Sequence, residues 1–425
     1  MSARADAAGP RRVVVTGMGV VSALGLDAPA HWAALKAGVC GIGPLEIRDL
    51  DRLSVTIGGQ AKGFVGEDRF ARSQLSLYDR HTQFALTAAA EAWAQADPAP
   101  TQDEALRAAV VIGTALPGMQ TLDDSYRAAF EEGKSRVHPF VVPRLMVSAP
   151  ASHISMIHGL KGPAWSVSTA CASANHAIGQ AFHLVRSGAA DLAVTGGAEA
   201  PLTFGAMKAW EGLRVMTRDV CRPFSKGRAG MAIAEGAGVF VLEERGRALA
   251  RGATILGEIA GFGMSADAGD IVQPSADGAA RAIAAALADG GLDVSEIAYV
   301  NAHGTGTAAN DRTGGPAPGL RGPCRRALGV LDQVDARACA GGGRRAGVRR
   351  RPGRPARGGD PPHDQSPRSR SRVRPRRDAQ HRARARDARR PLQRLRLRRS
   401  ERGARPASRL RPRRRGPGRA WSLLT

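Results

Sequence analysis

Short apolar runs and helical patterns alternate along residues 12–313. Runs that are apolar on both faces predict buried strands, at residues 12–16, 108–114, 165–167, 191–195 and 238–242. Apolar residues at the spacing of a helix face predict helices, at residues 31–37, 80–96, 149–158 and 171–185. Strands that alternate with helices in this way are typical of an α/β fold. We therefore expect a mostly parallel sheet with helices on both faces.

A second cycle of the same kind begins at Thr254. It predicts a strand, an alanine-rich helix and another strand, at residues 255–262, 279–287 and 297–301. The pattern stops at Gly314, beyond which arginine, proline and glycine dominate and Trp421 is the only aromatic residue. Such a composition cannot bury enough apolar surface to offset chain entropy, so we expect residues 314–425 to be a disordered tail.

Charge divides the chain at the same place. The net charge of +24 would indicate a nucleic-acid partner if the basic residues were spread evenly. Residues 314–425 instead hold 34 of the 62 basic residues and seven of the 38 acidic residues, so residues 1–313 carry a net charge of about −3. Arginine-rich disordered segments bind phosphate backbones. The tail is therefore either a nucleic-acid-binding arm or a segment without a selected function.

Cysteine spacing and hydropathy bear on the compartment. The cysteines at positions 40, 171, 221, 324 and 339 show neither paired nor metal-ligand spacing, which is typical of a reducing compartment. Residues 1–11 predict a disordered leader without the apolar core of a signal peptide. No apolar run approaches the ~18 residues needed to span a bilayer. We expect a cytoplasmic protein with no membrane contact, no bound metal and no nicotinamide cofactor.

A glycine-rich stretch, Gly17-Met-Gly-Val-Val-Ser22, follows the first predicted strand and suggests a dinucleotide-binding turn. Ser22 occupies the third glycine position, and no helix of suitable length follows directly. We therefore interpret these glycines as sites of tight packing around the strand rather than as a nucleotide site.

Cys171 lies where a predicted strand passes into a predicted helix. Unpaired N–H groups and aligned peptide dipoles at a helix start favour a thiolate over a thiol. The neighbours Ala170, Ala172, Ser173 and Ala174 are small, so an acyl chain could approach the sulfur closely. The alternative is a buried structural cysteine, because free cysteines are among the most buried residues.

His303 lies at the end of the predicted strand 297–301, on the turn Gly304-Thr-Gly-Thr307. The glycines leave room for a ligand, and the threonines add two hydroxyl groups. A histidine in such a position is by itself more often structural, so the cysteine and histidine stretches have to be considered together.

Together these stretches resemble the β-ketoacyl-acyl-carrier-protein synthases, the condensing enzymes of the thiolase superfamily. They are Trp165-Ser-Val-Ser-Thr-Ala-Cys171-Ala-Ser-Ala-Asn175 and Ala298-Tyr-Val-Asn-Ala-His303-Gly-Thr-Gly-Thr307. Further matching segments are residues 13–22, Arg222-Pro-Phe224 and residues 234–239. Residues 168–175 and 202–214 are similar to the nodulation-type branch, and the resemblance as a whole extends from about Arg12 to Thr313.

The resemblance implies a thiolase-like fold, in which two similar halves pack into a five-layer α/β/α/β/α sandwich. Residues 12–253 would form the N-terminal half, and residues 254–313 would form the start of a truncated C-terminal half. The resemblance also implies a homodimer that works with an acyl carrier protein. Substrates would be carried on the phosphopantetheine of that protein, and no other cofactor is implied.

The implied activity is that of a 3-oxoacyl-acyl-carrier-protein synthase, an acyltransferase of fatty-acid or related acyl-chain synthesis. Cys171 would accept an acyl group as a thioester. His303 would stabilise the enolate formed when malonyl thioester loses carbon dioxide. Thr305 and Thr307 would hydrogen-bond the pantetheine arm, with ordinary turn hydroxyls as the alternative. The family also uses a lysine, a second histidine and a Phe-Gly loop, which this chain lacks as written.

The missing motifs are permitted in another reading frame. Codons allowed for residues 331–341, read one base later, permit Ser-Thr-Lys-Ser-Met-His-Gly-His-Ala-Leu, the family's lysine-and-histidine motif. The same shift over residues 392–403 permits the Phe-Gly loop, and at residues 314–315 it permits the glutamate of the family's Asn310-Asp311-x-x-Glu pattern. Three motifs in family order and in one frame indicate a frameshift next to Thr313. We therefore expect no condensation by the chain as written.

Two other functions are left open. An α/β scaffold with an arginine-rich tail could bind RNA or DNA, and its gene would then show one intact reading frame. A catalytically inactive partner subunit, as in paired condensing enzymes, is the second alternative. The presence of Cys171 argues against it.

Overall fold

The computed structural model describes residues 10–313, which belong to one compact unit. At its centre is a six-stranded sheet in the order β5-β4-β6-β7-β1-β8. Its strands are β1 (Val13–Val21), β4 (Ala108–Gly113), β5 (Ala164–Val167), β6 (Leu192–Glu199), β7 (Gly236–Glu244) and β8 (Gly257–Ile259). A small second sheet consists of β2 (Gly43–Pro44) and β3 (Ile57–Gly58). The predicted tail, and the predicted leader up to residue 9, lie outside the described residues.

The helices alternate with these strands along the chain. They are α1 (Ala28–Ala37), α2 (Arg72–Leu75), α3 (Arg80–Ala96), α4 (Gln102–Ala105), α5 (Met119–Tyr126), α6 (Val141–Leu145), α7 (Ala149–His158), α8 (Ser173–Arg186), α9 (Phe204–Gly212), α10 (Arg245–Ala250), α11 (Ala276–Gly290) and α12 (Ala308–Thr313). Short helical turns occur at Leu50–Arg52, Gly66–Asp68, Arg127–Glu131 and Val294–Glu296.

The strand directions differ from the prediction. β4 is parallel to β5 and to β6, but β7 is antiparallel to β6 and β1, and β8 is antiparallel to β1. The sheet is therefore mixed, and the expectation of a mostly parallel sheet is wrong. The prediction failed because a strand that is buried on both faces has the same apolar pattern whichever way it runs.

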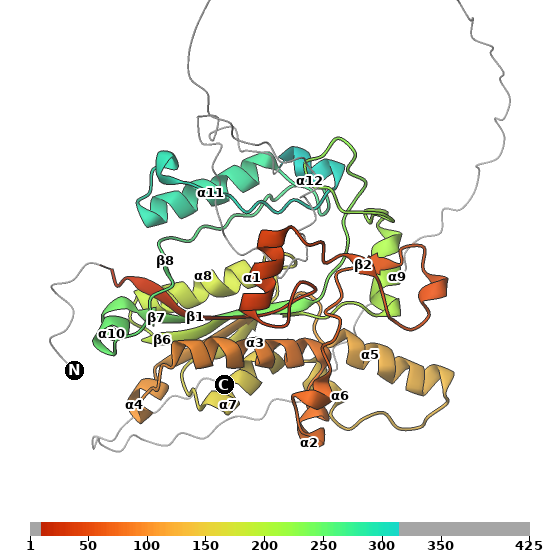
Figure 1. Cartoon of the computed structure of the whole chain (residues 1–425), viewed down its shortest axis with the longest axis horizontal. Helices are drawn as coiled ribbons and strands as arrows, with labels where there is room; N and C mark the ends of the chain where they lie inside the picture. The colour runs from red at the N-terminus through yellow and green to blue at the C-terminus, as the bar shows by residue number, and fades with distance from the viewer. Residues whose placement is uncertain (1–9, 314–425) are drawn as a thin grey trace, which may run out of the picture. The chain divides into compact units, whose positions relative to one another are not determined.

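Helices cover both faces of the sheet, as predicted (Figure 1). α3 and α7 pack on one face, and α8 packs on the other. Alternate residues of β4 belong to the two resulting cores. Val110 and Ile112 pack with Phe84 of α3, whereas Val111 packs with Phe182 of α8. Both cores therefore meet at β4, the strand beside β5, which leads to Cys171, and this close packing gives the site a rigid support.

The glycines after the first strand serve packing, as the sequence indicated. A Cβ atom at Gly17 would lie 2.0 Å from the carbonyl oxygen of Ala92, and one at Gly19 would lie 2.0 Å from that of Ala88. Both carbonyls belong to α3, so β1 approaches the backbone of this helix as closely as atoms allow. Any larger residue at either position would force the strand and the helix apart.

The same arrangement recurs in the second half. A Cβ atom at Gly261 would lie 2.5 Å from the carbonyl oxygen of Ala286, and one at Gly263 would lie 2.3 Å from that of Ala282. Both carbonyls belong to the alanine-rich helix α11. Both Gly-x-Gly segments therefore pack on helix alanines that are four residues apart, as expected for two similar halves.

The second half is otherwise sparse within residues 10–313. β8 has three residues instead of the predicted eight, and residues 297–301 show a single β-bridge position, at Val300, instead of the predicted strand. Tyr299 and Val300 are 57% and 39% exposed. A β-prone segment needs neighbouring strands to become one, and the described part of the chain supplies no sheet for it to join.

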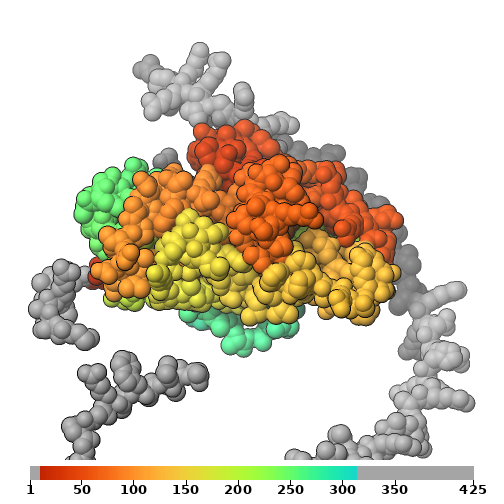
Figure 2. Space-filling model, turned by 90° about the horizontal axis from the view of Figure 1, so that it is seen from below, coloured from red at the N-terminus to blue at the C-terminus, as the bar shows by residue number. Residues whose placement is uncertain are grey.

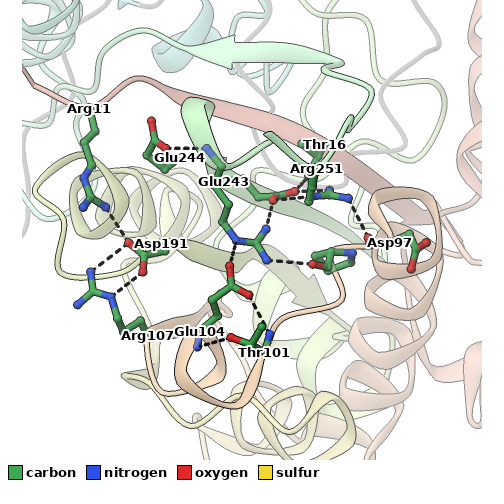
Figure 3. Close-up of polar contacts among 12 residues, drawn as sticks. Arg11, Thr16, Asp97, Thr101, Glu104, Arg107, Asp191, Glu243, Glu244 and Arg251 are labelled. Carbon is green, nitrogen blue, oxygen red and sulfur yellow. Dashed lines mark hydrogen bonds and ion pairs between the residues drawn. The ribbon is translucent and has the colours of Figure 1, made fainter. Parts of the chain in front are cut away.

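Charged side chains link distant segments of the chain through hydrogen bonds and ion pairs at one end of the sheet (Figure 3). At this end β4 and β6 begin and β7 ends. The Glu243 carboxylate is fully buried and accepts hydrogen bonds from the Thr16 hydroxyl at 2.5 Å and from the Arg251 guanidinium at 2.6 Å. Asp191 forms a bidentate ion pair with Arg107, at 2.5 and 3.0 Å. Cys171 follows β5 at the opposite end of the sheet.

Candidate active site

The turn that carries Cys171 has a constrained backbone. Ala170 has a φ of 51°, in the left-handed region that residues other than glycine rarely adopt. The buried Ser173 hydroxyl accepts a hydrogen bond from the Thr169 N–H at 2.9 Å and donates one to the Ala170 carbonyl at 2.6 Å. Such a conformation persists only where its surroundings hold it, and it is common at functional sites. Ser173, the first residue of α8, therefore presents Cys171 in a fixed position.

Cys171 is exposed and opens onto a cavity of about 320 Å³. This cavity lies where β4 and β6 end and β7 begins, the edge of an α/β sheet where ligands usually bind. Its lining is mainly apolar and includes Leu116, Ala174, Trp210, Met231 and Ile233. The structure thus excludes the buried structural cysteine and provides a space suited to an apolar group.

The turn that carries His303 is held by its neighbours. The Asp311 carboxylate is buried and accepts hydrogen bonds from the Phe224 N–H at 2.6 Å and the Gly306 N–H at 3.1 Å. The Gly306 carbonyl accepts one from the Gly230 N–H at 3.0 Å. The turn therefore has a defined shape without the strand that was predicted to lead into it.

Residues 230–231 contact both the turn that carries His303 and the cavity that Cys171 lines. Gly230 is bonded to the turn of His303, and the next residue, Met231, lines the Cys171 cavity. His303 is partly exposed and is not itself among the residues that line this cavity. The cysteine and the histidine thus lie on adjoining parts of the molecule, joined through residues 230–231.

The threonines of this turn bond within it. The Thr305 hydroxyl is buried and lies 2.7 Å from the Thr307 hydroxyl, and either oxygen could donate. The Thr307 hydroxyl also accepts a hydrogen bond from the Asn310 N–H at 3.3 Å, in the first turn of α12. This geometry matches the alternative of ordinary turn hydroxyls, and contact with pantetheine stays a prediction.

Sequence reasoning missed Glu199. This carboxylate lines the cavity and accepts hydrogen bonds from the N–H groups of Ala115 at 2.6 Å and Leu116 at 3.0 Å, and from the Thr114 hydroxyl at 3.3 Å. Burial raises the pKa of Glu199, against the effect of these hydrogen bonds. The available signal was one acidic residue in an otherwise uncharged stretch, residues 192–207.

No group of three or more His, Cys, Asp or Glu side chains among residues 10–313 could hold a metal ion. None of the helices in that range is long and apolar enough to cross a membrane.

Comparisons with known proteins identify the family of the chain. The N-terminal domain of beta-ketoacyl synthases matches residues 10–248, and the C-terminal domain of the same enzymes matches residues 256–315. Nodulation protein E of Rhizobium sp. (strain N33) is 46% identical over 302 residues, which are 71% of this chain and 75% of that protein.

A synthase and a solved structure extend the comparison. The 3-oxoacyl-[acyl-carrier-protein] synthase 2 of Staphylococcus aureus (strain COL) is 38% identical over 308 residues, 71% of this chain and 74% of its own. The structure of the ishigamide ketosynthase/chain length factor matches with a TM-score of 0.68 at 34% identity, covering 72% of this chain and 76% of that one. The chain therefore belongs to the beta-ketoacyl synthase family of condensing enzymes.

Proposed function

We propose that Cys171 is the acyl acceptor of a 3-oxoacyl-acyl-carrier-protein synthase. The observation that carries this proposal is an exposed thiol on a constrained strand-to-helix turn, at the mouth of a mainly apolar cavity. The cavity provides space for the acyl chain, and the turn fixes the direction from which the thioester arrives. An acyl chain would bury its methylene groups against the cavity wall, which favours binding.

The first step is a transfer between two thiols. The Cys171 sulfur attacks the carbonyl carbon of the acyl thioester, and the bond from that carbon to the carrier's sulfur then breaks. The carrier leaves as a thiolate and takes up a proton. The Cys171 N–H, two residues before the start of α8, would donate a hydrogen bond to the oxyanion formed in between.

The second step needs groups beyond Cys171. Malonyl thioester loses carbon dioxide, and the resulting enolate carbon attacks the acyl carbon on Cys171, releasing the thiol. His303 would donate a hydrogen bond to the enolate oxygen. The lysine, the second histidine and the Phe-Gly loop that complete this step in the family are permitted only in the shifted frame after Thr313. The chain as written therefore stops at the acylated cysteine.

The partners follow from the same proposal. An acyl carrier protein would deliver both substrates, and a second copy of the chain would pair at β5. β5 is an edge strand of the six-stranded sheet, and Ala164 in it is exposed. Met156 and Ile157 of α7, which packs against β5, are 73% and 52% exposed, and Figure 2 shows α7, in yellow, on the outer surface. An open edge beside apolar side chains favours pairing with another chain.

Acyl transfer tests the proposal directly. The intact chain would be incubated with an acyl-acyl-carrier protein, and the mass of the protein would be measured before and after hydroxylamine treatment. We expect one hydroxylamine-sensitive acyl group, which is absent in Cys171→Ala. Acylation that persists in Cys171→Ala would contradict the assignment of the nucleophile.

A further inference from the structure

One wall of the Cys171 cavity is the segment between β4 and α5. Thr114, Ala115 and Leu116 of this segment line the cavity together with Cys171. Three ionisable side chains that the proposed reaction does not use hold this segment: the fully buried Asp79 and His81 at the start of α3, and Glu199 at the end of β6, which itself lines the cavity.

Glu199 holds the first part of the wall. One of its oxygens lies 2.6 Å from the Ala115 N–H, and the other lies 3.0 Å from the Leu116 N–H and 3.3 Å from the Thr114 hydroxyl. Three donors therefore converge on one carboxylate. Hydrogen bonds are directional, so three of them to one side chain restrict where these three residues can lie.

Asp79 and His81 hold the other end of the segment. The Asp79 carboxylate accepts hydrogen bonds from the Thr121 N–H at 2.8 Å and the Thr121 hydroxyl at 2.6 Å. Its other oxygen lies 2.8 Å from His81 Nδ1, which in turn lies 3.3 Å from the N–H of Gly118. Both side chains are fully buried. The wall is thus held at one end by Glu199 of β6 and at the other by the buried Asp79 and His81 of α3.

We propose that Glu199 is a positioning residue that sets the acyl-chain preference of Cys171 by fixing this wall, with Asp79 and His81 anchoring its far end. The inference rests on the proposed acyl-accepting function. Dispersion contacts lose a quarter to half of their strength over a gap of about 0.5–1 Å. A wall that shifts by such an amount no longer contacts the acyl chain well. The gain in binding affinity of a long acyl chain over a short one therefore falls.

Alkylation of Cys171 measures this preference without the condensation step. The full chain would be treated with N-ethyl- and N-octyl-iodoacetamide, and intact mass would follow the saturable rate of labelling. Each methylene bound in an apolar site is worth about fourfold in affinity, so the octyl reagent should have the lower half-saturation concentration in the unaltered chain. The octyl advantage is the ratio of the half-saturation concentration of the ethyl reagent to that of the octyl reagent. In Glu199→Gln we expect this ratio to fall about tenfold, with the maximal rate of labelling unchanged.

Glu243→Gln is the matched control. Glu243 is a fully buried, hydrogen-bonded glutamate in the adjacent strand, but the register of β6 and β7 places it at the other end of the sheet from Glu199. Its substitution should lower the melting temperature without changing the octyl advantage. Thr114→Val, which removes one donor from Glu199, is a milder second variant and should lower the octyl advantage severalfold.

The outcomes separate the two ideas. If the unaltered chain shows no octyl advantage, the acyl cavity fails and the inference fails with it. If the unaltered chain shows the advantage and folded Glu199→Gln keeps it, only the inference is overturned. An equal loss in Glu243→Gln would also overturn it, because the effect would then be general destabilisation. Should Glu199→Gln not fold, an unchanged advantage in Thr114→Val overturns the inference, and a reduced one supports it.

Discussion

The N–H of Gly230 donates a 3.0 Å hydrogen bond to the carbonyl of Gly306, and this bond joins the wall of the Cys171 cavity to the turn of His303. A Cβ atom at Gly306, whose φ is 73°, would lie 2.8 Å from the Gly230 carbonyl oxygen, so these two backbone segments are in direct contact. The relative placement of thiol and imidazole therefore depends on this contact and on the groups that support it.

The first prediction concerns Asp311, the main such group. Asp311→Asn replaces a charged acceptor of two backbone N–H groups and should lower the local opening free energy of residues 303–307 by about 1–3 kcal/mol. Hydrogen exchange followed by mass spectrometry checks this. Asp219→Asn is the control, because Asp219 forms only an exposed ion pair with Arg222. Equal protection of residues 303–307 in both variants would show that Asp311 does not hold the turn.

The second prediction compares two cysteines. Cys171 is exposed, whereas Cys221 is 1% exposed and its sulfur lies 3.5 Å from the Thr305 carbonyl. Iodoacetamide should modify Cys171 faster than Cys221 by roughly tenfold or more, because the buried thiol reacts only after local opening. Peptide mapping of partly labelled protein gives both rates. Similar rates in folded protein would mean that the Cys171 turn is not formed as described.

The third prediction concerns stability in acid. Hydrogen bonds from Arg107, and further ones from Arg11, lower the pKa of Asp191. Its ionised form therefore contributes stability above the unfolded value of about 3.9, and this contribution is lost as pH falls through the lower folded pKa. Melting temperatures between pH 7 and pH 3 should fall less steeply for Asp191→Asn than for the unaltered chain. Arg107→Gln should behave similarly, and parallel curves for all three proteins would refute the ion pair's role.

The fourth prediction concerns the reading frame. Removing one base next to codon 313 should replace the arginine-rich segment by the lysine-and-histidine motif and the Phe-Gly loop. Loss of one donor to a developing negative charge typically costs ~100- to 1000-fold in rate, so the unrepaired chain should show no measurable condensation. Elongation of an acyl-acyl-carrier protein with malonyl-acyl-carrier protein tests both forms.

Two substitutions in the repaired protein make this test specific. Cys171→Ala should abolish acyl loading, and His303→Ala should leave loading largely intact while impairing decarboxylation. Condensation by the unrepaired chain at a rate near that of the repaired one would refute the frameshift, because its present sequence after Thr313 does not contain the missing groups.

Local signals in the sequence predicted local structure well. The 3.6-residue periodicity of residues 80–96 predicted α3 correctly, and the structure adds Asp79 as its N-cap. The strand-to-helix position of Cys171 followed from the change in apolar period between residues 165–167 and 171–185. Both features depend on neighbouring residues alone, so a sequence window contains the information.

Features that depend on distant contacts could not be predicted in this way. The antiparallel placement of β7 depends on pairing with β1, more than 200 residues earlier. The anchoring of the cavity wall by Glu199 joins segments 83–85 residues apart. Val300 lies in a β-prone run but has no sheet to join within residues 10–313. In each case a partner elsewhere in the chain decides the structure, and a local pattern does not identify that partner.

The position of the six-stranded sheet along the chain has a consequence for synthesis on the ribosome. Every strand of this sheet lies before residue 260, and proteins are made from the N-terminus, with folding beginning during synthesis. A loss of frame after codon 313 would reach a nascent chain whose central sheet had already been made. Such an error would leave Cys171, the acyl acceptor that we propose, beside a sheet that had already been made, and would remove the groups that the family uses for condensation.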